Sequence, residues 1–200
     1  MCVRYSVSEL RGSTIGIIGY GDIGRATARL AKAYGMKVLA LVRKSRSFDQ
    51  NDEYADVLIA NDVSNNDGMN QIFTESDYVL CALPLTETTY RCIGEKQFAL
   101  CKPNCVFINV GRGPIVDEDA LIVALQTKRL KGAALDVFTV EPLPAASPLW
   151  DLDNVLMSPH NMDQTDTFLI ESTTFFVEEQ LPRFIRGLPL LNHVNPALGY

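Results

Sequence analysis

The stretch that decides the fold is Ser13-Thr-Ile-Gly-Ile-Ile-Gly-Tyr-Gly-Asp-Ile-Gly24. Its β-branched residues at 15–18 predict a short buried strand. The glycines that follow in G-x-G-x-x-G spacing are Gly19, Gly21 and Gly24. The apolar residues that then recur at helical intervals are Ile23, Ala26, Leu30 and Ala33. A strand, a glycine turn and a helix in this order are typical of a dinucleotide site, where a pyrophosphate meets the helix N-terminus. The alternative is a glycine turn that only packs a helix on a sheet.

Composition narrows the classes of partner. The 200 residues suit one sizeable domain, and 18 Lys and Arg against 24 Asp and Glu leave a net charge of −6. We expect no nucleic-acid partner, because no basic run could follow a phosphate backbone. We expect no membrane span, because no apolar stretch reaches about 18 residues, and a cytoplasmic location is the default. The five cysteines predict reduced thiols in or near the core, and no metal site.

Strands and helices are expected to alternate along the rest of the chain. Further strands are predicted at 38–42, 77–83, 105–110, 132–138 and 154–157. Helices are predicted at 95–100, at 118–128, and as a long amphipathic helix at 165–186 with Pro182 as a kink or stop. The polar stretch 45–70 predicts a long loop with a short element inside. The alternation predicts an α/β fold with a doubly wound parallel sheet of the Rossmann type.

The residues after the second predicted strand bear on the choice of cofactor. An NAD enzyme usually carries Asp or Glu there, roughly 20 residues past the glycines, to bind the ribose diol. Here Arg43 lies 19 residues after Gly24 and opens the run Arg43-Lys-Ser-Arg46. Cations neutralise a 2′-phosphate that a carboxylate would repel, so the run predicts NADP(H) over NAD(H). A solvated basic surface is the alternative.

Three other polar residues follow predicted strands: Arg112, Glu141 and His160. Only a parallel sheet would bring them to one edge. There an imidazolium could give a proton to a carbonyl oxygen, a carboxylate could orient the ring, and an arginine could hold a substrate carboxylate. The alternatives are a hydrogen-bonded loop histidine and a surface arginine. His193, close to the C-terminus, is interpreted as having no catalytic role.

Taken together, the motifs identify a family. The chain resembles the D-isomer-specific 2-hydroxyacid dehydrogenases over residues 10–200, and most of all their glyoxylate/hydroxypyruvate reductase and phosphoglycerate dehydrogenase branches. The motifs, with their first and last residues, are Gly19-Tyr-Gly-Asp-Ile-Gly24, Leu83-Pro-Leu-Thr86, Asn109-Val-Gly-Arg-Gly-Pro-Ile-Val-Asp117, Ala134-Leu-Asp-Val-Phe138, Glu141-Pro142, Ser147-Pro-Leu-Trp150, Ser158-Pro-His160 and Gly199-Tyr200.

The resemblance implies an NAD(P)-dependent reductase of a small 2-oxo acid such as glyoxylate or hydroxypyruvate. By motif match, His160 is the acid–base, Glu141 its partner and Arg112 the substrate-orienting cation. NADP(H) is the preferred cofactor, and NAD(H) remains possible. The implied cofactor contacts are Gly19, Gly21, Asp22, Ile23, Gly24, Arg43, Lys44, Ser45, Leu83, Pro84, Val110, Gly111 and Asp136.

The chain departs from the family pattern in two places. Asn161-Met-Asp163 follows the histidine where the family has smaller residues, which puts the nicotinamide geometry in question. Family members also carry a substrate domain and a long dimer-forming helix before the glycine turn. We therefore expect a dinucleotide-binding domain over 8–187 and a tail over 188–200 that returns to a substrate domain absent from this chain. Family members are usually homodimers.

Those departures keep two functions open. The chain could be the cofactor domain of a dehydrogenase, weak or inactive by itself because its site would be open to water. It could instead be a module that binds NADPH without turnover. A methyltransferase with a glycine loop is disfavoured, because it would not need Arg112, Glu141 and His160.

Overall fold

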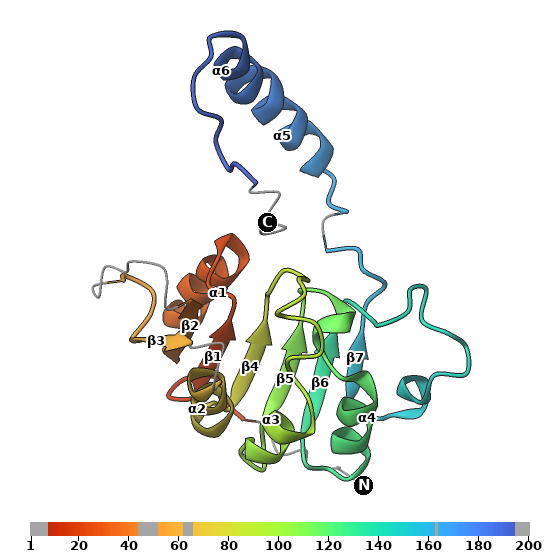
Figure 1. Cartoon of the computed structure of the whole chain (residues 1–200). Coiled ribbons are helices and arrows are strands. Elements are labelled where there is room, and N and C mark those ends of the chain that lie inside the picture. The colour runs from red at the N-terminus through yellow and green to blue at the C-terminus, as the bar shows by residue number, and fades with distance from the viewer. Residues whose placement is uncertain (1–7, 44–51, 62–65, 163, 195–200) are drawn as a thin grey trace, which may run out of the picture.

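The computed structural model describes residues 8–43, 52–61, 66–162 and 164–194. Within these residues it contains a seven-stranded parallel sheet in the order β3-β2-β1-β4-β5-β6-β7 (Figure 1). The strands are β1 (Thr14–Ile18), β2 (Lys37–Arg43), β3 (Val57–Asn61), β4 (Tyr78–Cys81), β5 (Val106–Asn109), β6 (Gly132–Leu135) and β7 (Val155–Met157). This is the doubly wound α/β architecture that the sequence predicts.

The strand order reverses at β1, which has β2 on one side and β4 on the other. Ile18, the last residue of β1, pairs with Leu41 of β2 and Cys81 of β4. The turns that leave β1 and β4 therefore begin side by side at the carboxyl edge of the sheet. A reversal of this kind leaves a crevice between diverging connections, which is where open α/β sheets bind ligands.

Helices α2 (Asp67–Glu75), α3 (Glu95–Leu100) and α4 (Glu118–Gln126) cover one face of the sheet (Figure 1). Its core contains a fully buried aromatic cluster of Phe73, Phe98 and Phe107, whose ring centroids lie 5.5 to 6.3 Å apart. Stacked and edge-on pairs at such distances add to the stabilisation from burial. The three helices therefore bury the hydrophobic side chains of this face of the sheet.

Helix α1 (Asp22–Ala33) packs on the opposite face, but not through the residues that the sequence pattern favoured. The predicted apolar stripe of Ile23, Ala26, Leu30 and Ala33 is exposed. The buried residues are instead Gly24, Ala28 and Ala31. Small residues spaced by three or four let the helix backbone approach the sheet closely, whereas the larger side chains fit only on the outside.

The interval 45–70 holds more regular structure than its polar composition indicated. Strand β3 is the short element expected inside it, and it extends the sheet beyond β2. Helix α2, which begins at Asp67, was not predicted. It begins at Asn66-Asp67-Gly68, a combination of residues that is typical of a turn, so the sequence pattern shows no sign of a helix start. Its larger buried residues, Met69, Ile72 and Phe73, come only after these three.

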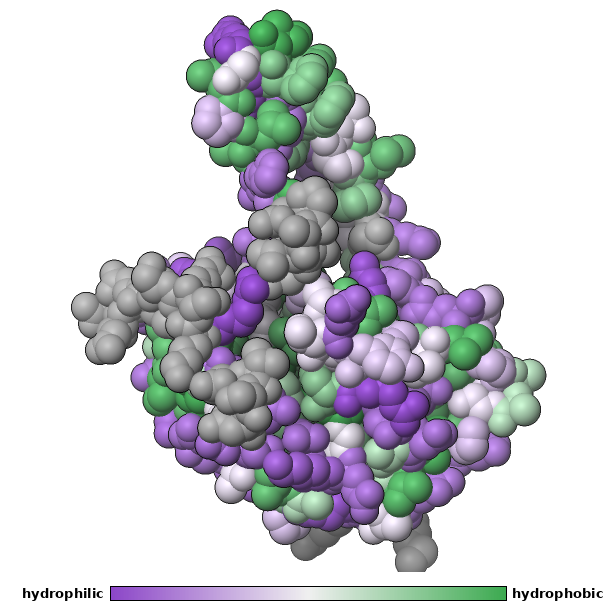
Figure 2. Space-filling view, in the orientation of Figure 1, coloured by the Kyte–Doolittle hydropathy of each residue, from purple (hydrophilic) through white to green (hydrophobic). Residues whose placement is uncertain are grey.

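The C-terminal helix stands away from the sheet (Figure 1). It consists of α5 (Phe168–Phe175), a π-helical turn η3 (Phe176–Gln180) and α6 (Leu181–Ile185). None of its residues is buried, so the predicted amphipathic helix is present without a packed face. Figure 2 shows hydrophobic side chains over it, and Leu169, Phe184 and Ile185 are 70–74% exposed. Pro182 lies just after the π-helical turn, where its missing N–H loosens the α-helical ladder.

Candidate active site and cofactor site

The three glycines of the first turn have different surroundings. Gly19 has a φ of 99°, and a Cβ there would lie 2.6 Å from the carbonyl oxygen of Ala82. A Cβ at Gly24 would collide with the carbonyl oxygen of Gly19. A Cβ at Gly21, in contrast, would meet no atom of the described residues within 4 Å, apart from its neighbours along the chain. Two glycines therefore shape the turn from within, while Gly21 faces open space.

The open glycine also starts α1. Gly21 is its N-cap and contributes no side-chain hydrogen bond, and the first helical bond runs from the Arg25 N–H to the Gly21 carbonyl. The N–H groups of residues 22–24 thus lie at the positive end of a 12-residue helix, next to a surface that no Cβ covers. Such a surface suits a pyrophosphate. Asp22 and Ile23 are exposed there, as contacts with a ligand require.

The turns after β4 and β5 pack against each other beside this site. A Cβ at Gly111 would lie 2.6 Å from the carbonyl oxygen of Leu83, so only glycine allows this approach. Asn109 holds the second turn, because its Oδ1 accepts from the Gly111 N–H at 3.1 Å and its Nδ2 donates to the Arg112 carbonyl at 3.3 Å. Leu83, Pro84 and Val110 are half-buried along the same edge.

Arg43 ends β2 at the carboxyl edge and is exposed. Its backbone pairs in register with Asn61 of β3. The position agrees with the one from which a residue after β2 reaches the adenosine ribose in doubly wound folds. Lys44 and Ser45, predicted with it, lie outside the described residues.

His160 and Glu141 form a direct pair although they come from different strand ends. His160 Nδ1 lies 2.7 Å from Glu141 Oε2, and Glu141 Oε1 accepts from the Phe138 N–H at 2.9 Å. Burial by itself would raise the pKa of Glu141, but the hydrogen bonds from His160 and Phe138, together with the Arg112 charge, lower it below its usual value. The carboxylate is therefore ionised at neutral pH and holds the ring through Nδ1, which leaves Nε2 as the nitrogen that can serve a substrate.

His160 adopts a left-handed backbone conformation, with a φ of 51°. A residue other than glycine in this region carries some strain, and such residues gather at functional sites. The ring is partly exposed, at 40% of its side-chain surface. It can therefore reach a ligand at the carboxyl edge.

Arg112 is brought to the same place by close backbone packing. The next residue, Gly113, touches the backbone of Phe138 so tightly that any Cβ would collide with it. Arg112 Nη1 donates to its neighbour's carbonyl, that of Gly111, at 2.7 Å, and its charge acts on Glu141. The structure thus gathers Arg112, Glu141 and His160 at one edge, as the parallel-sheet argument predicts.

Asp136 has a supporting position in this arrangement. It is buried, and its Oδ1 accepts from Ser158 Oγ at 2.5 Å and from the Asn161 N–H at 3.4 Å. It therefore fixes the segment that carries His160 from both sides. Sequence reasoning missed Ser158 and Asn109 as supporting residues, and the signal for both was a polar residue at the end of an apolar strand.

Of the segment that departs from the family pattern, Met162 is 55% exposed. Asp163 lies outside the described residues. His193 is exposed and follows the C-terminal helix in the sequence. Among the residues that the structure describes, no group of His, Cys, Asp or Glu could hold a metal ion, and Cys81, Cys101 and Cys105 are buried free thiols.

Comparison with known proteins agrees with this geometry. Residues 3–161 match the family model described as the NAD-binding domain of D-isomer-specific 2-hydroxyacid dehydrogenases. The chain belongs to this family. Its similarity to glyoxylate reductase from Thermococcus gammatolerans is 37% identity over 177 residues, which is 88% of this chain and 47% of that enzyme. It is 36% identical to D-3-phosphoglycerate dehydrogenase from Methanocaldococcus jannaschii, over 96% of this chain and 35% of that enzyme.

A solved structure supports the family assignment in three dimensions. The NADPH-dependent glyoxylate/hydroxypyruvate reductase from Sinorhizobium meliloti, crystallised with NADP and sulfate, superposes with a TM-score of 0.83 at 32% sequence identity. The match covers 100% of this chain and 60% of the solved one. The chain spans about half the length of the curated glyoxylate reductase that it resembles. The family and the Rossmann-type fold predicted from the sequence are both confirmed.

Proposed function

We propose that this chain is the cofactor-binding part of an NADP(H)-dependent reductase that converts a small 2-oxo acid, such as glyoxylate or hydroxypyruvate, to its 2-hydroxy acid. The observation that carries the proposal is the 2.7 Å pair of His160 and Glu141, held with Arg112 at the edge that also carries the glycine turn. A site that only bound a dinucleotide would need the turn but not these three side chains.

Each of the three residues has a distinct part in the proposed reaction. A bound reduced nicotinamide supplies the hydride. Protonated His160 gives the proton at Nε2 to the carbonyl oxygen of the substrate, which becomes the hydroxyl. Glu141 keeps Nδ1 engaged and holds the orientation of the ring. Arg112 turns from the Gly111 carbonyl to the substrate carboxylate, for which its planar pair of donors is suited.

The choice of NADP(H) rests on charge. A cation, Arg43, ends β2 where NAD-dependent folds usually present a carboxylate to the ribose diol. The solved relative from Sinorhizobium meliloti binds NADP. NAD(H) is the weaker alternative, since the glycine turn contacts the part that both dinucleotides share.

The arrangement of domains belongs to the same proposal. We take 8–187 as the dinucleotide-binding domain and 188–200 as a tail that returns to a substrate domain, which the longer relatives have room for. Among the described residues, no helix is both long and apolar enough to cross a membrane. A homodimeric assembly and a cytoplasmic location stay predictions from the family resemblance and the sequence.

The test uses the two histidines of the chain as a matched pair. In the complete gene product, NADPH oxidation is followed at 340 nm with glyoxylate and with hydroxypyruvate. His160→Gln should lower kcat by a factor of about 10² to 10⁴, the usual contribution of a general acid, and should leave the affinity for NADPH nearly unchanged. His193→Gln should behave like the wild type.

Two results would count against the proposal. Turnover that survives His160→Gln would remove the histidine from the chemistry. Saturable binding of NADPH with no turnover of any small 2-oxo acid would favour the second function, a module that binds the dinucleotide without catalysis.

A further inference from the structure

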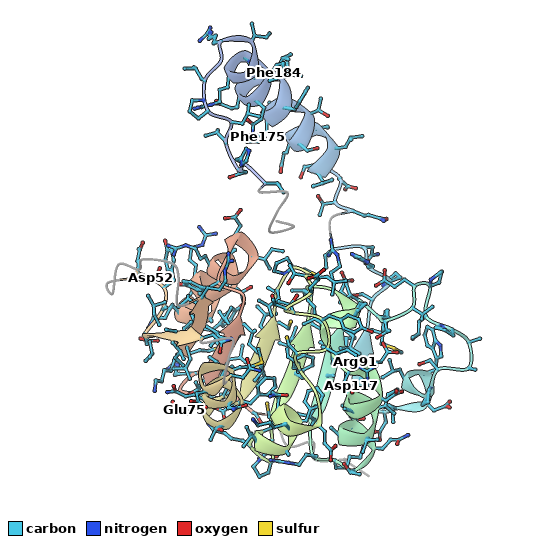
Figure 3. The ribbon with its side chains drawn as sticks, in the orientation of Figure 1. Asp52, Glu75, Arg91, Asp117, Phe175 and Phe184 are labelled. Atoms are coloured by element: carbon cyan, nitrogen blue, oxygen red, sulfur yellow. The ribbon has the colours of Figure 1, made fainter. Side chains whose placement is uncertain are left out.

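Three side chains outside the candidate catalytic set form a cluster beside the glycine turn. Tyr20 lies within the turn, Arg25 in the first turn of α1, and Asp52 on the segment before β3. Tyr20 Oη donates to Asp52 Oδ1 at 2.7 Å, and Arg25 Nη1 donates to Asp52 Oδ2 at 2.5 Å. Figure 3 shows Asp52 beside α1. The cluster joins two parts of the chain that are far apart in sequence.

The Asp52 carboxylate also accepts two hydrogen bonds from the backbone of its own segment. Its Oδ1 accepts from the backbone N–H groups of Tyr54 at 2.9 Å and Ala55 at 3.1 Å. Oδ1 thus accepts three hydrogen bonds from this chain, and Oδ2 pairs with Arg25. The side chain is only 9% exposed. Asp52 therefore links the glycine turn to the segment before β3.

Tyr20 and Arg25 are held by further contacts besides their hydrogen bonds to Asp52. The Tyr20 ring is 6% exposed and belongs to the hydrophobic cluster under α1 that includes Ala28 and Val42. The Arg25 guanidinium carbon lies 5.3 Å from the centre of that ring, a cation–π distance. Burial raises the pKa of Tyr20, so its hydroxyl remains a donor. Burial alone would raise the pKa of Asp52, but the hydrogen bonds from Tyr20, the Tyr54 N–H and Arg25 lower it.

We propose that Asp52 is a positioning residue for the dinucleotide. Acting through Tyr20 and Arg25, it holds the glycine turn and the first turn of α1 in the shape that presents their N–H groups to a pyrophosphate. Tyr20 stands between Gly19 and Gly21, so a shift of its ring moves the backbone at the open glycine directly. Binding geometry tolerates only small displacements of such donors. The inference rests on the proposed function, which places a dinucleotide at this turn.

The test measures dinucleotide affinity in the full chain with Asp52→Asn and Tyr20→Phe. Tyr20→Phe removes only the hydroxyl and keeps the buried ring, so it guards against a general loss of folding. We expect each variant to bind NADPH about fivefold to tenfold more weakly, as the loss of one or two hydrogen bonds predicts. NADH affinity should fall by the same factor, because the pyrophosphate is common to both. The double variant should lose less affinity for NADPH than the product of the two single losses, because each substitution removes the same Tyr20–Asp52 hydrogen bond.

Asp56→Asn is the matched control. Asp56 lies on the same segment and also links it to α1 and β2, but at the far end: it accepts from Lys32 Nζ at 2.6 Å and from the Val38 N–H at 2.8 Å. The control should lower the unfolding midpoint and leave NADPH affinity at the wild-type value. All titrations are made well below the unfolding midpoint of each variant, with circular dichroism to check the fold.

The outcomes separate the inference from the function on which it rests. Wild-type affinity in Asp52→Asn and Tyr20→Phe would overturn the positioning role while leaving the proposed function intact. An equal loss in Asp56→Asn would also overturn it, because the effect would then reflect stability in general. A wild-type chain that binds neither NADPH nor NADH would overturn the proposed function, and the inference with it.

Discussion

At the scale of single residues, the end of β2 carries a guanidinium where a carboxylate would select NAD(H). Replacing Arg43 by Gln removes a charge that is proposed to pair with the 2′-phosphate. Hydrogen bonds between charged groups contribute about 1.5–3 kcal/mol, so NADPH affinity should fall roughly 10- to 100-fold, and NADH affinity should hardly change. Isothermal titration of the chain with both dinucleotides measures this.

Lys37→Gln is the control for that substitution. Lys37 begins the strand that Arg43 ends, so it is an exposed cation at the opposite edge of the sheet. The control should bind both dinucleotides like the wild type. If Arg43→Gln weakens NADPH and NADH equally, or weakens neither, the cation does not select the cofactor.

The common location of the three candidate catalytic residues could be predicted from the sequence, because it depends only on the topology of the sheet. Arg112, Glu141 and His160 each follow a strand, and parallel strands put their carboxyl ends on one edge. The link through Asp52 could not be predicted in the same way. It depends on a contact between residues 32 positions apart in sequence, Tyr20 and Asp52, and no local pattern records such a contact.

At the scale of elements, α1 shows why the helix was easier to predict than its orientation. Periodicity located the helix, but both of its sides carry apolar residues. Close packing at Gly24, Ala28 and Ala31 decided which side is buried, because bulky Leu30 and Tyr34 cannot approach the sheet as closely. Size, rather than hydropathy, determined the face.

Helix α4 offers an element-scale test with a pH dependence. Its N-cap, Asp117, accepts from the Ala120 N–H at 3.3 Å and pairs with Arg91 Nη2 at 2.6 Å (Figure 3). The hydrogen bond from Arg91 is the main cause that lowers the pKa of Asp117. A lowered folded-state pKa means that the carboxylate stabilises the fold above its usual pKa of about 3.9 and loses this effect as the pH falls through the folded value.

Asp117→Ala should therefore lower the free energy of unfolding by about 1 kcal/mol at pH 7, the usual contribution of an N-cap. The difference from the wild type should shrink as the pH is taken from 5 to 3. Urea unfolding at several pH values measures both. Asp119→Ala removes an exposed acid from the same first turn and serves as the control. A difference that stays constant down to pH 3 would show that the ionised carboxylate is not what stabilises the helix start.

At the scale of the whole molecule, the two faces of the sheet are unequally covered. Helices α2, α3 and α4 seal one face, whereas on the face of α1 the outer strand β7 leaves Leu156 73% exposed. The C-terminal helix, with no buried residue, covers neither. The turns after β1, β4 and β5, which carry the glycines and Arg112, nevertheless lie side by side at the carboxyl edge, because these three strands are neighbours inside the sheet.

The central claim is that the open surface at Gly21 receives the pyrophosphate of NADPH, and a titration of the chain with NADPH tests it most directly. Gly21 has a φ of −92°, so alanine fits its backbone, and among the described residues a Cβ there would touch no atom beyond its neighbours along the chain. Gly94→Ala, at the N-cap of α3, is a control with similar free space, its nearest contact being 3.5 Å away.

The account predicts that the wild type and Gly94→Ala bind NADPH alike, and that Gly21→Ala binds it about tenfold or more weakly with an unchanged unfolding midpoint, because only the ligand would meet the new methyl group. Equal NADPH affinity in Gly21→Ala and the wild type, or no saturable binding by the wild type, would contradict it.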